Sequence, residues 1–120
     1  MAVGLGGFVG SVGRFLITKY LGWMETAIPM GTFVSNMLGC LIMGIVFGLI
    51  ERGGITIGPD TKLFLTVGVC GGLTTFSTFM NENLRMVSQA DYFTAALYAG
   101  LSLSAGLLMI VVGKWLATSF

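Results

Sequence analysis

The third apolar segment of the chain contains the stretch Gly71-Gly72-Leu73-Thr74-Thr75-Phe76-Ser77-Thr78-Phe79. Paired glycines, four hydroxyl residues and two phenylalanines suit a lipid-facing helix poorly, because glycine, threonine and phenylalanine all have lower helix propensity than leucine. We therefore predict that the helix breaks here. Within a bilayer, non-helical backbone is tolerated only where protein or a water-filled cavity covers it. Because free carbonyls at such a break bind cations and free N–H groups bind anions, the stretch indicates an ion site.

The composition around this stretch is that of an integral membrane protein. The chain has 120 residues, of which 55% are hydrophobic and 9% are charged, and its mean hydropathy is +0.93. A soluble domain carries about 25% charged residues. The net charge of +1 provides no basic face for nucleic acid, and the chain has no histidine, the commonest general base and metal ligand. We expect neither a nucleic-acid partner nor an enzyme.

Four apolar segments predict an all-α membrane domain. They cover residues 2–21, 31–50, 63–80 with a more polar continuation to 88, and 92–112. A helix needs about 20 apolar residues to cross the hydrocarbon core of a bilayer. The sequence therefore predicts a single membrane domain over residues 1–120, with four transmembrane helices, a break in the third, and no room for a soluble domain.

Pairs of small residues recur at the spacing of one helical turn. They are Gly6 with Gly10, Gly44 with Gly48, and Ser102 with Gly106. Small residues four apart form a stripe along which a second helix approaches closely. We interpret these pairs as ordinary helix packing in a compact bundle.

The positive charges are almost evenly divided between the two membrane surfaces. Four crossings place both termini on one side, and the positive residues are Arg52, Lys62 and Lys114 on that side, against Lys19 and Arg85 on the other, with Arg14 added if its side chain reaches that surface. Because an excess of Lys and Arg on one side sets the orientation of a membrane protein, nearly equal charges on the two sides give this chain little preference for either orientation. Insertion in both orientations, giving an antiparallel homodimer, is one hypothesis. A single orientation, set by a partner or by one dominant charge, is the other.

Two polar residues within the first two spans each have two interpretations. Arg14, near the end of the first span, either extends to the interface or forms a cationic vestibule that attracts anions, and the two are compatible. Asn36 is the only strongly polar side chain of the second span. Its amide either donates N–H groups to an anion that is losing water or caps the broken backbone near Thr75. Spacing alone leaves both alternatives open.

Phe76 and Phe79 lie three residues apart and share one face of the helix that resumes after the break. Such a pair usually contributes to packing. The alternative is that the positive edges of the rings face a small anion, which they attract without a formal charge. Ser77 and Thr78 add hydroxyl donors beside them.

Further hydroxyl and amide groups occur at helical spacing in two other spans. Tyr98 and Ser102 are four residues apart in the fourth span, as are Thr32 and Asn36 in the second. Residues four apart lie on the same face of a helix. Together the four side chains predict a polar track through an apolar bundle.

Glu82 lies just past the break, where it is either solvated or paired with Arg85. At a pore mouth an unpaired carboxylate would repel anions, so its role is open. The distribution of acids also bears on a rival function, a small multidrug-type dual-topology transporter. Proton-coupled export of cations needs a carboxylate within the membrane, and residues 2–21 and 31–50 contain none.

Three blocks of the sequence resemble the Fluc-type fluoride channels of the CrcB family. Residues 6–15 are similar to a first-helix pattern GGxxGAxxRY, with Ser11 in place of Ala and Phe15 in place of Tyr. Residues 31–39 resemble the second-helix pattern around its asparagine, and residues 71–79 match the third-helix signature in full. The resemblance covers essentially the whole chain.

The resemblance implies a fluoride channel that exports fluoride and relieves its toxicity. It implies an antiparallel dual-topology homodimer with two pores, embedded in the lipid of the inner or plasma membrane. A structural Na⁺ at the dimer centre would be held by the carbonyls of Gly71 and Thr74 from both subunits. Phe76 and Phe79 would contact fluoride by their ring edges while Asn36 donates a hydrogen bond. The other implied pathway residues are Ser77, Thr78, Tyr98 and Ser102, with Arg14 in the vestibule and Glu82 near the opposite pore end.

Overall fold

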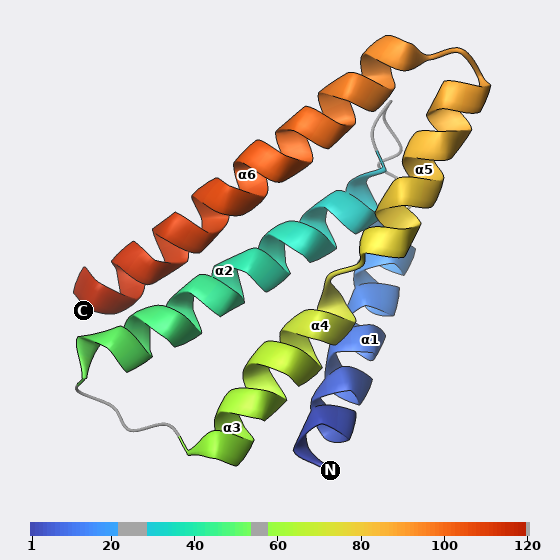
Figure 1. Ribbon diagram of the computed structural model, residues 1–120. Coiled ribbons are helices and arrows are strands. Elements are labelled where there is room, and N and C mark those ends of the chain that lie inside the picture. Colours follow the sequence, from blue (N-terminus) through green and yellow to red (C-terminus); the bar gives the residue numbers. More distant parts are fainter. Residues whose placement is uncertain (22–28, 54–57, 120) are drawn as a thin grey trace.

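The computed structural model describes residues 1–21, 29–53 and 58–119, and these residues are organised as helices. The elements are α1 (Ala2–Leu21), α2 (Met30–Arg52), α3 (Pro59–Leu63), η2 (Phe64–Cys70), α4 (Gly71–Leu73), α5 (Phe76–Ser88) and α6 (Tyr92–Ser119) (Figure 1). The segments α3, η2, α4 and α5 follow one another as a single broken helix. The predictions of an all-α protein and of a broken third helix are both confirmed.

Three helical segments within the described residues are long and apolar enough to cross a bilayer. They are Met30–Arg52, the broken helix Pro59–Ser88, and Tyr92–Ser119. With 20 residues, α1 has the length of a crossing helix, about 30 Å, but its glycines, Arg14 and Lys19 make it less apolar. The 28 residues of α6 continue beyond residue 112, where the apolar segment of the sequence ends. The chain is a multi-pass membrane protein.

Local chemistry explains where several of these helices begin and end. Gly53 ends α2 with φ of 78°, a left-handed conformation that glycine adopts without steric cost. Pro59 stands at the first turn of α3, where its missing N–H is not needed. Asp91 precedes α6, and its Oδ1 accepts the backbone N–H of Thr94 at 3.4 Å, as an N-cap does.

Glycines bring α2 and α6 into close contact along most of their length, and the two helices run in the same direction (Figure 1). An added methyl group at Gly48 would lie 2.8 Å from Cβ of Ala117, and one at Gly44 would collide with the carbonyl of Ile110. Contacts this short leave no room for a larger side chain. The stripe of Gly44 and Gly48 is thus a packing surface, as its spacing predicts.

A second glycine contact joins α1 to the first half of the broken helix, and the two run side by side in Figure 1. A methyl group added to Gly68 would lie 2.7 Å from Cα of Gly6, and one at Gly10 would collide with the carbonyl of Val69. The Gly6–Gly10 pair therefore positions α1 against η2 and α4, immediately before the break.

The buried core is small, and much of the outer surface is apolar. A cluster of buried side chains lies between α5 and α6 and consists of Phe79, Met86, Ala95 and Tyr98. Large apolar side chains on the outside, such as Phe8 and Leu103, are exposed. An apolar surface of this kind faces lipid or another protein chain.

Candidate functional site

The break in the helix occupies two residues, Thr74 and Thr75. Both are extended, with φ and ψ of −87° and 154° for Thr74 and −149° and 124° for Thr75. The seven residues of η2 that precede α4 form a π-helix, a rare arrangement that is frequently found at functional sites. The break thus falls within the glycine- and threonine-rich stretch from which it was predicted.

Side chains from two other helices bind backbone groups that the break releases. The N–H of Thr75 donates to Oδ1 of Asn36, on α2, at 2.9 Å. The carbonyl of Gly72 accepts Nε–H of Arg14, on α1, at 3.1 Å. Because an unpaired backbone group within a bilayer costs several kcal/mol, these two side chains stabilise the broken geometry.

The other carbonyls at the break that accept no hydrogen bond from the described residues are those of Gly71, Leu73 and Thr74. The N–H and the hydroxyl of Thr74 both donate to the carbonyl of Cys70, at 2.9 and 2.8 Å. In the described parts of the chain, no group of three His, Cys, Asp or Glu side chains is placed to hold a metal ion. A cation bound here would therefore rest on backbone oxygens, which suit a hard cation.

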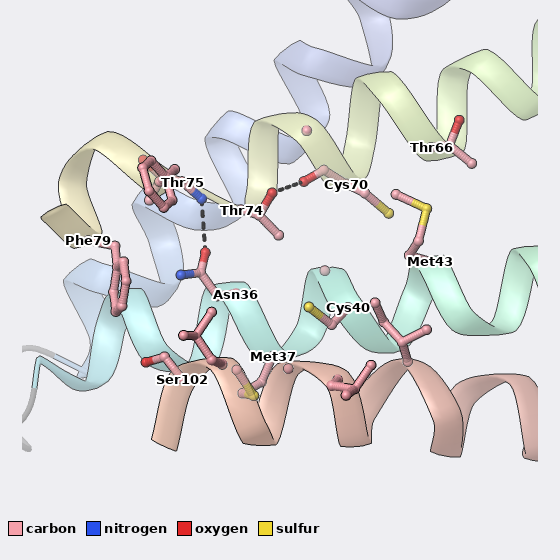
Figure 2. A pocket seen from close by; sticks show the side chains of 17 residues that line it. Asn36, Met37, Cys40, Met43, Thr66, Cys70, Thr74, Thr75, Phe79 and Ser102 are labelled. Carbon is pink, nitrogen blue, oxygen red and sulfur yellow. Dashed lines mark hydrogen bonds between the residues drawn. The ribbon is translucent and has the colours of Figure 1, made fainter. Parts of the chain in front are cut away.

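The orientation of Asn36 follows from its bond to the backbone. An N–H group only donates, so the amide oxygen of Asn36 must face Thr75 and the amide nitrogen must point away from it. Figure 2 shows this nitrogen on the side of the Phe79 ring. One of the two interpretations of Asn36, capping of the broken backbone, is therefore confirmed. The N–H donors of the Asn36 amide point away from Thr75, toward the side of Phe79.

A cavity of about 520 Å³ lies between α2, the broken helix and α6 (Figure 2). Most of its lining is apolar. The polar residues among those that line it are Asn36, Thr66, Thr74, Thr75 and Ser102. The hydroxyl of Ser102 is buried and has no hydrogen-bond partner among the described residues, and such an unsatisfied donor calls for a structural or functional explanation.

Aromatic rings extend from this cavity toward the α5–α6 cluster. Phe76 and Phe79 both line the cavity, with ring centroids 6.3 Å apart and planes tilted by 48°. Phe79 also contacts Tyr98, at 5.0 Å between centroids. Phe79 is 5% exposed and Phe76 is 72% exposed. Phe79 is held in place on both sides, whereas Phe76 presents most of its surface outward.

One turn beyond Phe79, the carboxylate of Glu82 accepts hydrogen bonds from side chains of both α2 and α6. The hydroxyl of Thr32 donates to Oε2 of Glu82 at 2.9 Å, and the hydroxyl of Tyr98 donates to Oε1 at 2.8 Å. Thus the carboxylate is neither simply solvated nor paired with Arg85 in the described structure. Sequence reasoning missed this shared acceptor, although Glu82 lies three residues after Phe79 and so on its face of α5.

The comparisons with known proteins agree on one family. Residues 1–114 match the family described as "CrcB-like protein, Camphor Resistance (CrcB)". The chain belongs to this CrcB family. It is 40% identical over 116 residues to a Flavobacterium psychrophilum protein, covering 96% of this chain and 93% of the relative. It is also 40% identical over 120 residues to a Desulfotalea psychrophila protein, covering 100% and 92%. A Phocaeicola vulgatus protein is 41% identical over 114 residues, covering 94% and 93%.

All three relatives are named "Fluoride-specific ion channel FluC". The family is therefore one of ion channels and not of enzymes. In this CrcB-family chain, the structure brings most of the expected pathway residues into two neighbouring groups. The cavity group contains Asn36, Phe76, Phe79 and Ser102, and the second group contains Thr32, Glu82 and Tyr98.

Three expected pathway residues of this CrcB-family chain lie apart from both groups. Ser77 and Thr78 occupy the first turn of α5 and are not among the residues that line the cavity. Since Phe76 and Phe79 share one face, the two residues between them point to other faces of the helix. Arg14 lies at the break, on the side of α1, where it binds Gly72.

Replacing Glu82 with leucine is expected to destabilise this CrcB-family chain by about 1–3 kcal/mol for each buried hydroxyl left without an acceptor. Tyr98 is fully buried and Thr32 is 6% exposed, so water does not readily replace the carboxylate. Thermal unfolding in detergent measures the effect. Glu82→Gln is the control, because its amide retains an acceptor and the second hydroxyl can rotate. Equal melting temperatures for Glu82→Leu and wild type would show that these bonds do not contribute to stability.

Proposed function

We propose that the chain forms a passive, fluoride-selective channel that exports fluoride and thereby relieves its toxicity in the cell. One observation carries the proposal. An apolar cavity next to the helix break is lined by Asn36, Phe76, Phe79 and Ser102, and the hydroxyl of Ser102 is buried without a partner among the described residues. All of these groups are neutral. The names of the relatives support fluoride as the ion.

Neutral donors suit fluoride for a physical reason. Fluoride is small and strongly hydrated, so a pore must replace its water shell without holding the ion too tightly for exit. An amide N–H, a hydroxyl and the positive edge of a ring each attract an anion weakly. The absence of a positive side chain among the residues that line the described cavity fits this requirement.

The proposed path passes from the cavity along Phe79 to Tyr98 and then to Thr32 and Glu82. The 5.0 Å contact between the rings of Phe79 and Tyr98 makes the two groups continuous. Glu82 would stand near one end of the path, where two hydroxyl donors partly offset its charge. Ser77 and Thr78 would contribute hydroxyl groups along the polar track, and Arg14 would contribute a positive potential at the vestibule.

The proposed assembly is an antiparallel, dual-topology homodimer with four crossings per copy and two pores, embedded in the lipid of the inner or plasma membrane. Several features support it. The cavity is bounded on one side by Phe76, which is 72% exposed, so a second chain can complete it. The 20 residues of α1 are long enough for a fourth crossing. The nearly equal positive charges on the two sides favour insertion in both orientations.

A structural Na⁺ is part of the proposal, held at the dimer centre by the carbonyls of Gly71 and Thr74. These two carbonyls fit, because they have no donor among the described residues and Gly71 is exposed. One copy supplies two oxygens, and a two-fold partner would supply two more for a hard cation. When bound, the ion would supply a fixed positive charge that offsets the inward-pointing carbonyl dipoles.

Flux from liposomes tests this function directly. Purified protein is reconstituted into liposomes loaded with potassium fluoride or potassium chloride, and anion release is followed with ion-selective electrodes after valinomycin is added. We expect rapid fluoride release and negligible chloride release. If fluoride stays trapped while the protein is folded, the channel proposal is lost. Uptake of an organic cation driven by a proton gradient would instead favour the multidrug-type transporter.

The dual topology has its own test. A short tag is fused to the C-terminus, and its cleavage by added protease is measured in intact inner-membrane vesicles of each orientation. We expect the same fraction of the tag to be cleaved in right-side-out and in inside-out vesicles. Tag accessibility from one side alone would reject dual insertion. That outcome would leave the liposome result unaffected.

Replacing Phe79 with isoleucine is expected to reduce fluoride flux by at least about tenfold while the protein stays folded. Isoleucine keeps apolar bulk but removes the ring edge that faces the anion. Flux per protein in liposomes measures the effect, and the melting temperature reports any loss of packing against Tyr98. Phe93→Ile is the matched control, because Phe93 is exposed on α6 and is absent from the residues that line the cavity. Unchanged flux in Phe79→Ile would contradict the ring-edge role.

A further inference from the structure

Arg14 and the carbonyl of Gly72 form the only hydrogen bond between α1 and the broken helix among the side-chain hydrogen bonds of the described residues. We propose that Arg14 is a positioning residue for the cation site. Its Nε–H holds the Gly72 carbonyl, so this oxygen is not free to turn toward the cation that we propose for Gly71 and Thr74. The inference rests on the proposed function and assigns to Arg14 a role that does not depend on attracting anions.

The Gly72 carbonyl needs a hydrogen-bond donor from outside its own helix because of where that helix breaks. In an uninterrupted helix it would accept the N–H of Phe76, four residues on. The extended Thr74 and Thr75 carry that N–H away. A carbonyl left without a donor inside a bilayer is costly, and water or a cation would compete for it. The guanidinium at 3.1 Å removes this competition.

The approach of α1 makes the bond possible. A methyl group added to Gly72 would lie 2.7 Å from the carbonyl oxygen of Gly7 and 2.9 Å from the backbone nitrogen of Ser11. Residues 7, 11 and 14 lie three and four apart, on one face of α1. The face that touches Gly72 therefore includes Arg14. Contact through glycine on both helices places the guanidinium within hydrogen-bond distance of the break.

The carbonyls at the break thus have distinct surroundings. Gly72 is held by Arg14, whereas Gly71, Leu73 and Thr74 accept no hydrogen bond from the described residues. If Arg14 lost its Nε donor, the Gly72 oxygen would also be free to turn or to bind water. The number and direction of the oxygens around the cation would then change, and Na⁺ affinity would fall.

Three substitutions separate the donor from the charge. In Arg14→Gln, the side-chain nitrogen occupies the same position along the side chain as Nε of arginine, so the donor is kept and the charge is lost. In Arg14→Met, a methyl group occupies that position, so the donor and the charge are both lost. In Arg14→Lys, a methylene stands there and the charge stays, with its donor one bond farther out.

The measurements are fluoride flux from liposomes and the rise in melting temperature that Na⁺ causes relative to a bulky organic cation. We expect Arg14→Gln to need an Na⁺ concentration within about threefold of that of wild type for half of its thermal stabilisation. We expect Arg14→Met to lose at least about tenfold in flux and to need about tenfold more Na⁺ for half of its thermal stabilisation, the effect of one lost hydrogen bond. Arg14→Lys should lie between them.

The opposite order overturns the inference. If the Na⁺ stabilisation of Arg14→Lys matches that of wild type while that of Arg14→Gln is lost, the charge of Arg14 and not its Nε donor supports the cation site. Equal Na⁺ stabilisation in all variants would also overturn it. Should Arg14→Met fail to fold, the comparison of Arg14→Gln with Arg14→Lys still decides. Absence of fluoride flux in wild type would defeat the proposed function, whereas the Na⁺-dependent melting data would still test the role of Arg14.

Discussion

Replacing Asn36 with leucine is expected to abolish fluoride flux and to destabilise the protein as well. The amide oxygen accepts the Thr75 N–H at 2.9 Å, and its loss leaves that group unsatisfied at a cost of about 1–3 kcal/mol. The amide nitrogen lies on the side of the Phe79 ring, and both residues line the cavity that we propose for the anion. Removing one preorganised donor to an anion has an effect of about 100-fold in other proteins. Liposome flux and thermal unfolding measure the two losses separately.

Asn36→Asp is the matched control for this variant. The aspartate keeps an acceptor for the Thr75 N–H and has the same shape, but it removes the N–H donors. We expect a melting temperature close to that of wild type together with flux as low as that of Asn36→Leu. Wild-type flux in Asn36→Asp at neutral pH would show that Asn36 serves only to cap the broken backbone.

Replacing Gly10 with alanine is expected to lower the free energy of unfolding by about 1–3 kcal/mol, the usual cost of overpacking. An added Cβ would collide with the carbonyl of Val69 and lie 2.9 Å from the backbone nitrogen of Leu73. These are backbone atoms, so no flexible side chain can move aside. Helix α1 would have to shift away from the broken helix, and the bond from Arg14 to Gly72 would lengthen. Melting temperature and flux should therefore fall together.

Gly4→Ala is the control for this prediction. Gly4 lies on the same helix, and an added methyl group there meets no atom within 4 Å among the described residues. Alanine is also a better helix former than glycine, so stability should be unchanged or slightly higher. A similar loss of stability in both variants would indicate a general effect on α1 and would contradict the close approach at Gly10.

Much of the fold could be predicted from local composition. Apolar segments of about 20 residues predict membrane helices because burial in lipid depends on the residues of the segment itself. The break could be predicted for the same reason, since paired glycines and consecutive threonines weaken a helix wherever they occur. The π-helix of residues 64–70 could not, because FLTVGVC has no local feature that distinguishes it from an ordinary apolar helix.

The candidate site was predictable in its residue types but not in its connections. Polar residues at helical spacing in an apolar span predict a polar face, as Thr32 with Asn36 and Tyr98 with Ser102 show. Which of them meet depends on how α2, α5 and α6 pack. Thr32 and Tyr98 share Glu82, whereas Asn36 and Ser102 line the cavity. Residues up to 66 positions apart had to be brought together for this, and spacing within one helix contains no such information.

The sequence alone determined that the chain lies in a membrane and that its third helix breaks between Gly71 and Phe76, because both depend on side chains acting over a few neighbouring residues. Only the tertiary structure decided which backbone groups of the break are satisfied. Asn36 takes the Thr75 N–H and Arg14 takes the Gly72 carbonyl, each from a different helix. The physical reason is that a hydrogen bond forms only within about 3 Å, and the glycine contacts between helices set those distances.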